Sequence, residues 1–258
     1  MGIIAKGNVM TFVTELLFCI ALWIVIGRAR KGLKLPYIRR VGGLDALDEA
    51  IGRATEMGRP VHFSPGISDV NEAQTLASMA ILDYVAEQTA KHDVPLLVSN
   101  NKVIVHSLTE EIVKNAYLKQ QKSESFNPDN IRYLSDNQFG YATGVTGILR
   151  RERAATNILI GAFWAESLIF AQTGYEIGAI QIAGTANTHQ IPFFVAACDY
   201  CLIGDEIYAA SAYLSKESVL LGSLITSDYV KLLIIAVLIV GSLFMYGRSN
   251  ALSDLLKR

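Results

Sequence analysis

The stretch PVHFSPGISDVNEAQTLASMAILDYVAEQTAKHDVPLLVS, residues 60–99, decides the fold. It opens with a short apolar run at residues 61–64 and closes with another at residues 95–99. Between them, residues 69–91 carry the apolar spacing of a long helix. Two short strands joined by a helix predict a parallel βαβ unit, because parallel strands need a long crossover connection.

The same alternation continues along the chain. We expect further strands at residues 131–135, 157–163, 179–183 and 200–203, separated by helices at residues 107–119, 139–152, 166–175, 191–197 and 205–214. An earlier helix is expected over residues 44–55. Short apolar strands covered on both faces, joined by right-handed crossovers, predict an α/β fold. We expect a doubly wound, mostly parallel, Rossmann-like sheet of about six strands.

Two uncharged or nearly uncharged apolar runs flank this region. They are TFVTELLFCIALWIVI at residues 11–26 and LLIIAVLIVGSLFMY at residues 232–246. Each approaches the roughly 20 apolar residues that cross a bilayer, so both predict transmembrane helices. The expected organisation is an N-terminal transmembrane helix (1–28), a basic connector and helix (29–59), a central α/β domain (60–218), and a linker, C-terminal transmembrane helix and short tail (219–258).

Basic residues set the expected orientation. Six of them follow the first apolar run, and only Lys6 precedes it; the six are Arg28, Arg30, Lys31, Lys34, Arg39 and Arg40. Because such clusters stay cytoplasmic, we expect a two-pass membrane protein with a cytoplasmic central domain. The cluster follows the apolar core instead of leading it, which favours an uncleaved anchor over a signal peptide.

Charge also bears on the partners. The formal net charge of −1 provides no general attraction to nucleic acid, so no nucleic-acid partner is expected. The two apolar runs make membrane lipid the expected partner. Glu15 lies inside the first apolar run, where a carboxylate is costly unless it is paired or reaches the interface. Arg248, at the outer end of the second run, is its candidate partner. The alternative is that Glu15 reaches the outer headgroups.

Small polar residues follow every expected strand. The candidate ligand-binding residues are Ser64, Gly66, Asn100, Asn101, Asp136, Asn137, Glu166, Thr185, Asn187 and Asp205. In doubly wound sheets, ligands bind beyond the carboxyl ends of the strands, so these groups predict a pocket for a polar small molecule. The alternative is that they only form turns and cap helices, a role for which the same residue types are favoured.

Motifs for specific chemistry are weak, and we predict no catalytic residue, no metal ligand and no particular cofactor. FSPGISD, residues 63–69, has one glycine where a dinucleotide fingerprint needs three. His62 is expected to be a hydrogen-bonded core histidine. Cys198 and Cys201 have C-x-x-C spacing without a second pair, which favours structural cysteines. The glycines at 140, 144 and 147 share one helix face, which favours helix packing over phosphate binding.

Four segments carry a family resemblance. They are IGRATEMGRPVHFSPG (51–66), SNN (99–101), SDN (135–137) and DYCLIGDEIYAASAYLS (199–215). Together they resemble an uncharacterised prokaryotic family of membrane proteins with a domain of unknown function. The resemblance implies anchorage by two membrane helices and an α/β domain, and it implies no catalytic residue.

Three functions follow from these observations. The first is a non-catalytic membrane-anchored module that forms homo-oligomers and scaffolds or recruits another membrane-associated protein. The second is a sensor or binding module for a nucleotide-like or other polar metabolite at the strand ends. The third is a membrane-tethered enzyme that uses Asp136, Glu166 or Asp205 as an acid or base, and it ranks last because no nucleophile or cofactor loop accompanies them.

Overall fold

A computed structural model describes residues 42–215 and 218–246, together with residues 15–16, 18–20, 23–24 and 26–27 of the first apolar run. The chain divides into two compact units. One comprises residues 38–215, and the other comprises residues 1–37 and 216–258. The larger unit includes α2 (Gly42–Met57), which the sequence analysis assigned to the connector. Leu44, Leu47 and Ile51 of α2 are buried in the core, which accounts for its membership of this unit.

The larger unit is built on a six-stranded sheet in which every neighbouring pair is parallel. Its strands are β1 (Val61–Gly66), β2 (Leu96–Asn100), β3 (Ile131–Tyr133), β4 (Thr156–Ala162), β5 (Ile180–Thr185) and β6 (Tyr200–Ile203). The order is β3-β2-β1-β4-β5-β6, so the direction of winding reverses between β1 and β4. The prediction of an α/β fold with a parallel sheet is therefore confirmed.

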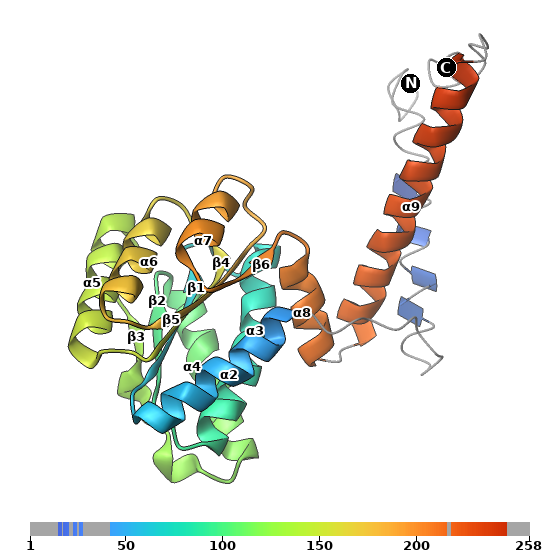
Figure 1. Ribbon diagram of the computed structural model, residues 1–258. Coiled ribbons are helices and arrows are strands. Elements are labelled where there is room, and N and C mark those ends of the chain that lie inside the picture. Colours follow the sequence, from blue (N-terminus) through green and yellow to red (C-terminus); the bar gives the residue numbers. More distant parts are fainter. Residues whose placement is uncertain are drawn as a thin grey trace, which may run out of the picture. The chain divides into compact units, whose positions relative to one another are not determined.

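Helices cover both faces of the sheet (Figure 1). One face carries α2, α3 (Ala73–Lys91), α4 (Val103–Lys119) and α8 (Glu206–Ser215), and the other carries α5 (Gln138–Glu152), α6 (Glu166–Glu176) and α7 (Ile191–Ala197). Between α4 and β3 lie two short 3-10 helices, η1 (Ser123–Ser125) and η2 (Pro128–Asn130). Each face has its own core, since strand residues alternate between the two. Phe63 and Val98 belong to the first cluster, and Phe163 and Phe170 to the second.

Two helices begin at positions that differ from the prediction. α3 begins at Ala73 instead of residue 69, because the Asp69 carboxylate accepts a hydrogen bond from the neighbouring Val70 N–H (2.7 Å) and stays in the loop. α4 begins at Val103 instead of residue 107. Its start was missed because Val103 and Ile104 are β-branched and no capping residue precedes them.

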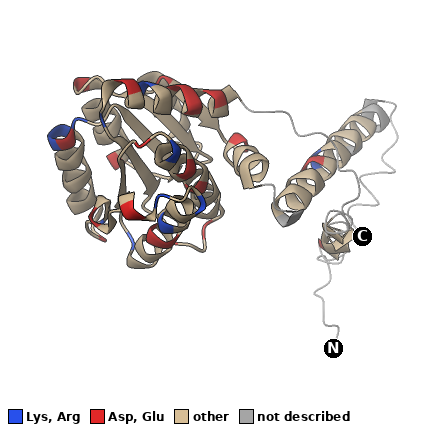
Figure 2. Ribbon diagram, turned by 90° about the horizontal axis from the view of Figure 1, so that it is seen from below, with Lys and Arg blue, Asp and Glu red and all other residues tan. Residues whose placement is uncertain are grey.

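The smaller unit contains α9 (Ser218–Tyr246). Within it, Leu220–Ser242 is the one helix among the described residues that is long and apolar enough to cross a membrane. Only 12% of its most apolar window is buried, so most of its apolar side chains face outward. Asp228 and Lys231 are its only charged residues, and their charged groups lie 3.9 Å apart. Figure 2 accordingly shows α9 mostly in tan, the colour of uncharged residues.

Two flanking membrane spans were expected, and the described residues contain one. The described residues of the first apolar run are helical, and none of them belongs to the candidate span. It does approach α9 closely, since a Cβ added to Gly222 would lie 3.0 Å from Ile26 Cγ1 and 3.2 Å from Ile26 Cα. Glu15 is exposed, and its proposed partner Arg248 lies outside the described residues.

Candidate functional site

The carboxyl ends of β1 and β4, where doubly wound sheets usually bind ligands, are closed by main chain. A Cβ on Gly66 would collide with the carbonyl oxygen of Ala162, and one on Gly161 would collide with that of Pro65. Gly66 has φ of +90°, and Ile67 N–H donates to Ala162 O at 3.0 Å. Gly66 is one of the predicted ligand-binding residues, and its lack of a side chain lets β4 pass against β1.

Ser64 also serves an internal contact. Its hydroxyl lies 2.7 Å from the hydroxyl of Tyr141, which in turn donates to the carbonyl oxygen of Ser99 at 2.8 Å. Because Tyr141 has one hydroxyl proton, Ser64 must be the donor to Tyr141. Burial raises the pKa of Tyr141 above its usual value, so this phenol stays protonated. The pair ties α5 to β1 and β2.

Asn101, Asp136 and Asn137 meet around the turn that leads into α5. Asn101 Nδ2 donates to Ser135 O at 2.6 Å, and Asn137 Oδ1 caps α5 by accepting from Phe139 N–H and Gly140 N–H. Asp136 is exposed and lies 3.7 Å from the ammonium of Lys102. Capping accounts for Asn137, as the alternative reading expected.

The remaining predicted residues lie at the ends of β4, β5 and β6. Glu166 is buried, and its oxygens accept from Trp164 N–H (2.8 Å) and Gln138 Nε2 (2.5 Å). Thr185 donates to Gln74 Oε1 at 3.1 Å, and Asn187 Nδ2 donates to Phe163 O at 3.1 Å. The Asp205 carbonyl accepts the N–H groups of Tyr208 and Ala209 at the start of α8. These contacts hold loops together.

Asn100, at the carboxyl end of β2, is the exception. It is fully buried, and neither its amide nitrogen nor its amide oxygen has a hydrogen-bond partner among the described residues. Leu96 and Val98 share its side of β2 and belong to the core beneath α3 and α4. Alternation therefore directs the Asn100 side chain toward the same two helices.

Two more buried polar atoms without partners come from those helices. Thr75 Oγ1, in the first turn of α3, and His106 Nδ1, in the first turn of α4, are buried and unpaired in the described part of the chain. α3 follows β1 and α4 follows β2, and the two helices pack along each other. The topology thus brings Thr75, Asn100 and His106 to one end of the sheet, on one face.

The same two helix starts lack side-chain caps. The N-cap residues are Glu72 for α3 and Lys102 for α4, and neither side chain bonds the helix backbone. Free N–H groups at helix N-termini attract anions. Thr75 and His106 were missed by the sequence analysis, because no motif marks a polar side chain that loses its partner only on folding.

A different polar row crosses the middle of the sheet. Ser99 Oγ lies 2.9 Å from His62 Nε2, and His62 Nδ1 lies 2.8 Å from Asn157 Oδ1. Asn157 Nδ2 donates to Gln181 Oε1 at 3.3 Å, and Gln181 Nε2 donates to Ala197 O at 3.0 Å. The Ala197 carbonyl can only accept a hydrogen bond, so Gln181 donates to it and in turn accepts from Asn157 Nδ2. Asn157 Oδ1 is then the acceptor that faces His62, and His62 carries its proton on Nδ1. Burial lowers the pKa of His62 to about 4.

This arrangement confirms His62 as a hydrogen-bonded core histidine. Room for the row comes from Gly174 of α6, where a Cβ would collide with the Gln181 side chain. Register pairs His62 with Asn157 and Asn157 with Gln181 across neighbouring strands. We therefore assign the row to strand pairing and not to catalysis.

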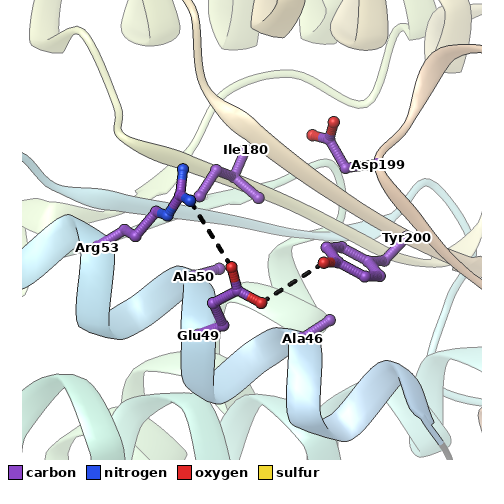
Figure 3. Close-up of a pocket in the computed structure, with 7 residues that line it drawn as sticks. All are labelled: Ala46, Glu49, Ala50, Arg53, Ile180, Asp199 and Tyr200. Carbon is purple, nitrogen blue, oxygen red and sulfur yellow. Dashed lines mark hydrogen bonds and ion pairs between the residues drawn. The ribbon is translucent and has the colours of Figure 1, made fainter.

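A shallow cleft of about 320 Å³ lies at the opposite end of the strands, beside α2 (Figure 3). Glu49 faces Arg53 (3.9 Å) and the Tyr200 hydroxyl (3.5 Å), and Asp199 points away from them toward Gln181 N–H. Arg53 and Glu49 are 60% and 55% exposed, so water screens this pair strongly. The cleft provides no buried polar group that needs a ligand.

The glycine face of α5 serves internal packing for two of its three members. A Cβ on Gly140 would lie 2.8 Å from Ser135 Oγ, and one on Gly144 would lie 2.9 Å from Leu134 Cδ1. Only Gly147 faces open space. It borders a second cleft of about 390 Å³ between α5 and α6, whose lining includes Phe139 and Ile169.

Cys198 and Cys201 lie beside each other at the end of α7 and in β6, and both are half-buried. Hydrogen bonding to Cys201, together with burial, raises the pKa of Cys198, and the same hydrogen bond lowers the pKa of Cys201. The described residues contain no cluster of three or more His, Cys, Asp or Glu side chains that would hold a metal ion.

Comparison with known proteins identifies a family and no function. The family whose model matches residues 1–255 is described as a domain of unknown function, DUF6754. The chain belongs to this family. No curated protein and no solved structure matches it. The roles considered below therefore rest on the physical chemistry of its own residues.

Proposed function

We propose that this protein is a membrane-anchored binding module that holds a small polar ligand at the carboxyl end of β2, between the first turns of α3 and α4. The observation that carries the proposal is Asn100, buried with both amide atoms unpaired. Each buried polar group left without a partner costs about 1–3 kcal/mol. A ligand that supplies the missing partners removes that cost.

The unpaired groups define the ligand's chemistry. Asn100 Nδ2 needs an acceptor and Asn100 Oδ1 needs a donor, while the uncapped starts of α3 and α4 offer N–H groups to an anion. A phosphate ester that also carries hydroxyl groups meets all three requirements, and nucleotides and sugar phosphates are both of this kind.

Anchorage completes the proposed role. α9 supplies one span, and the close approach of Gly222 to Ile26 supports a second helix packed against it. With the basic residues that follow the first apolar run, this supports a two-pass protein with its α/β domain in the cytoplasm.

A thermal-shift panel of nucleotides and sugar phosphates on the purified full chain tests the proposal. A ligand at 100 times its Kd should stabilise the fold by about 2.7 kcal/mol, and Asn100→Ala should abolish the shift. The matched control is Asn187→Ala, whose amide is already bonded to Phe163 O and which should keep the shift. A panel without a hit, or a hit that survives Asn100→Ala, contradicts the proposal.

A second candidate function is the self-associating scaffold that recruits a membrane-associated partner. The cleft between α5 and α6 favours it, because two of the side chains that line it, Phe139 and Ile169, are 69% and 41% exposed. Light scattering of the detergent-solubilised chain tests this candidate. A monomer at micromolar concentration contradicts it, and an oligomer dispersed by Phe139→Ser supports it. The enzyme alternative has less support, because two of its three candidate acids or bases are already engaged within the protein. Asp136 pairs with Lys102, and both Glu166 oxygens accept internal hydrogen bonds.

A further inference from the structure

The first turns that carry Thr75 and His106 also expose apolar side chains. Leu76, next to Thr75, is 53% exposed; Val103 and Ile104, at the start of α4, are 55% and 60% exposed. Neither helix needs these residues for its own packing, since the buried positions beside them are Thr75, Ala77 and Val105. Exposed apolar groups gathered beside a polar site are typical of a binding surface.

We propose that the ligand of this site is an anionic amphiphile. Its phosphate head would bind at Asn100 and the two helix starts, and its apolar chain would lie over Leu76, Val103 and Ile104. This inference rests on the proposed function and adds the ligand's chemical class. The ammonium of Lys102, the N-cap residue of α4, lies 3.7 Å from the Asp136 carboxylate, so the attraction to the head rests on the helix N–H groups and on the Asn100 amide.

The continuity of the two surfaces along the chain supports a single ligand. Asn100 is followed after two residues by Val103 and Ile104, and Thr75 is followed directly by Leu76. A free sugar phosphate would satisfy the polar groups and leave the three apolar side chains in water. An acyl chain covers them, and a membrane-anchored domain meets such molecules at the bilayer it is tethered to.

Two probes with the same head test the inference. Binding of glycerol 3-phosphate and of 1-hexanoyl-lysophosphatidic acid would be measured on the full chain in lipid nanodiscs, with empty nanodiscs as a control for partitioning. Each methylene that leaves water strengthens binding about fourfold. The acylated probe should therefore bind at least about tenfold more tightly, even if only two methylenes are buried.

Variants separate the two parts of the site. Leu76→Ser combined with Ile104→Ser should remove the advantage of the acyl chain and leave glycerol 3-phosphate binding unchanged. Leu118→Ser is the matched control, because Leu118 is 50% exposed at the other end of α4, and it should keep the advantage. Asn100→Ala should abolish binding of both probes.

The outcomes distinguish this inference from the proposed function. Equal affinity for both probes, lost in Asn100→Ala, would overturn the amphiphile and support the polar site. An acyl advantage that persists in the double variant, or that empty nanodiscs reproduce, would show partitioning and overturn the inference. Binding of neither probe would also overturn it, and the ligand panel above would then decide the proposed function separately.

Discussion

The buried histidine of β1 predicts how the fold responds to acid. His62 is fully buried, with Asn157 Oδ1 and Ser99 Oγ within 2.9 Å of its two ring nitrogens. Burial lowers its pKa from 6.5 to about 4, because the core cannot solvate an imidazolium. Protonation would also place a second N–H on Nε2, opposite a hydroxyl that now donates to it.

The sign and size of the effect follow from proton linkage. Above pH 6.5 the ring is neutral in both the folded and the unfolded chain, so it adds no pH dependence. Between pH 6.5 and about 4 only the unfolded chain takes up the proton, and stability falls as pH falls. The interval from 6.5 to about 4, at 1.36 kcal/mol per pH unit, gives a loss of about 3 kcal/mol.

Urea unfolding of the detergent-solubilised chain between pH 7.5 and 4 measures this loss. His62→Gln keeps an amide donor for Asn157 but cannot be charged, so its free energy of unfolding should fall with pH less steeply than that of the wild type. His92→Gln, at an exposed position after α3, is the control and should follow the wild type. Parallel pH profiles for the wild type and His62→Gln would refute the reasoning.

Three further predictions concern other positions. Asn100→Leu should raise the melting temperature of the ligand-free chain while abolishing ligand binding, because it replaces an unpaired buried amide with an apolar group of similar size; a lower melting temperature would argue that water or protein already satisfies the amide. Gly66→Ala should lower the free energy of unfolding, measured by urea titration, by about 3 kcal/mol or more, since φ is +90° and the methyl group would meet Ala162 O. Gly147→Ala, in open space on α5, should instead raise the free energy of unfolding by about 1 kcal/mol. In a Cys19→Ser background at pH 8, iodoacetamide should modify Cys201 before Cys198, because the hydrogen bond between them lowers the pKa of Cys201 and raises that of Cys198. Peptide mass spectrometry follows the two reactions, and Cys198→Ala should slow the one at Cys201. Equal rates at the two thiols would contradict the hydrogen bond.

Local patterns predicted most of the elements. The runs at residues 200–203 and 191–197 correspond to β6 and α7 without change of bounds, because apolar runs between turn residues depend on neighbouring residues only. The start of α3 was misplaced, since the Asp69 carboxylate bonds the neighbouring Val70 N–H in the loop and the helix begins only at Ala73. The residue at which a helix begins depends on the contacts that the preceding loop makes with the rest of the fold.

The candidate site was predicted less well. The sequence placed ten candidate residues, nine of them polar and the tenth Gly66, at strand ends, and their types suit both capping and binding. In the folded chain Ser64, Asn137, Glu166 and Thr185 found partners within the protein, whereas Asn100 did not. Thr75 and His106 could not have been selected, because nothing in their neighbouring residues shows that their polar atoms end up buried and unpaired.

The sequence by itself determined the parallel α/β architecture, the apolar character of α9 and the positions where polar groups leave the strands, since all three follow from hydrophobic periodicity and turn chemistry. Only the tertiary structure decided that β1 and β4 close on each other through Gly66 and Gly161, and that the Asn100 amide has no hydrogen-bond partner among the described residues. Hydrogen bonds over long sequence distances are made or lost only when strands and helices pack. Whether a buried polar side chain has a partner is therefore a property of the packed chain and not of its local sequence.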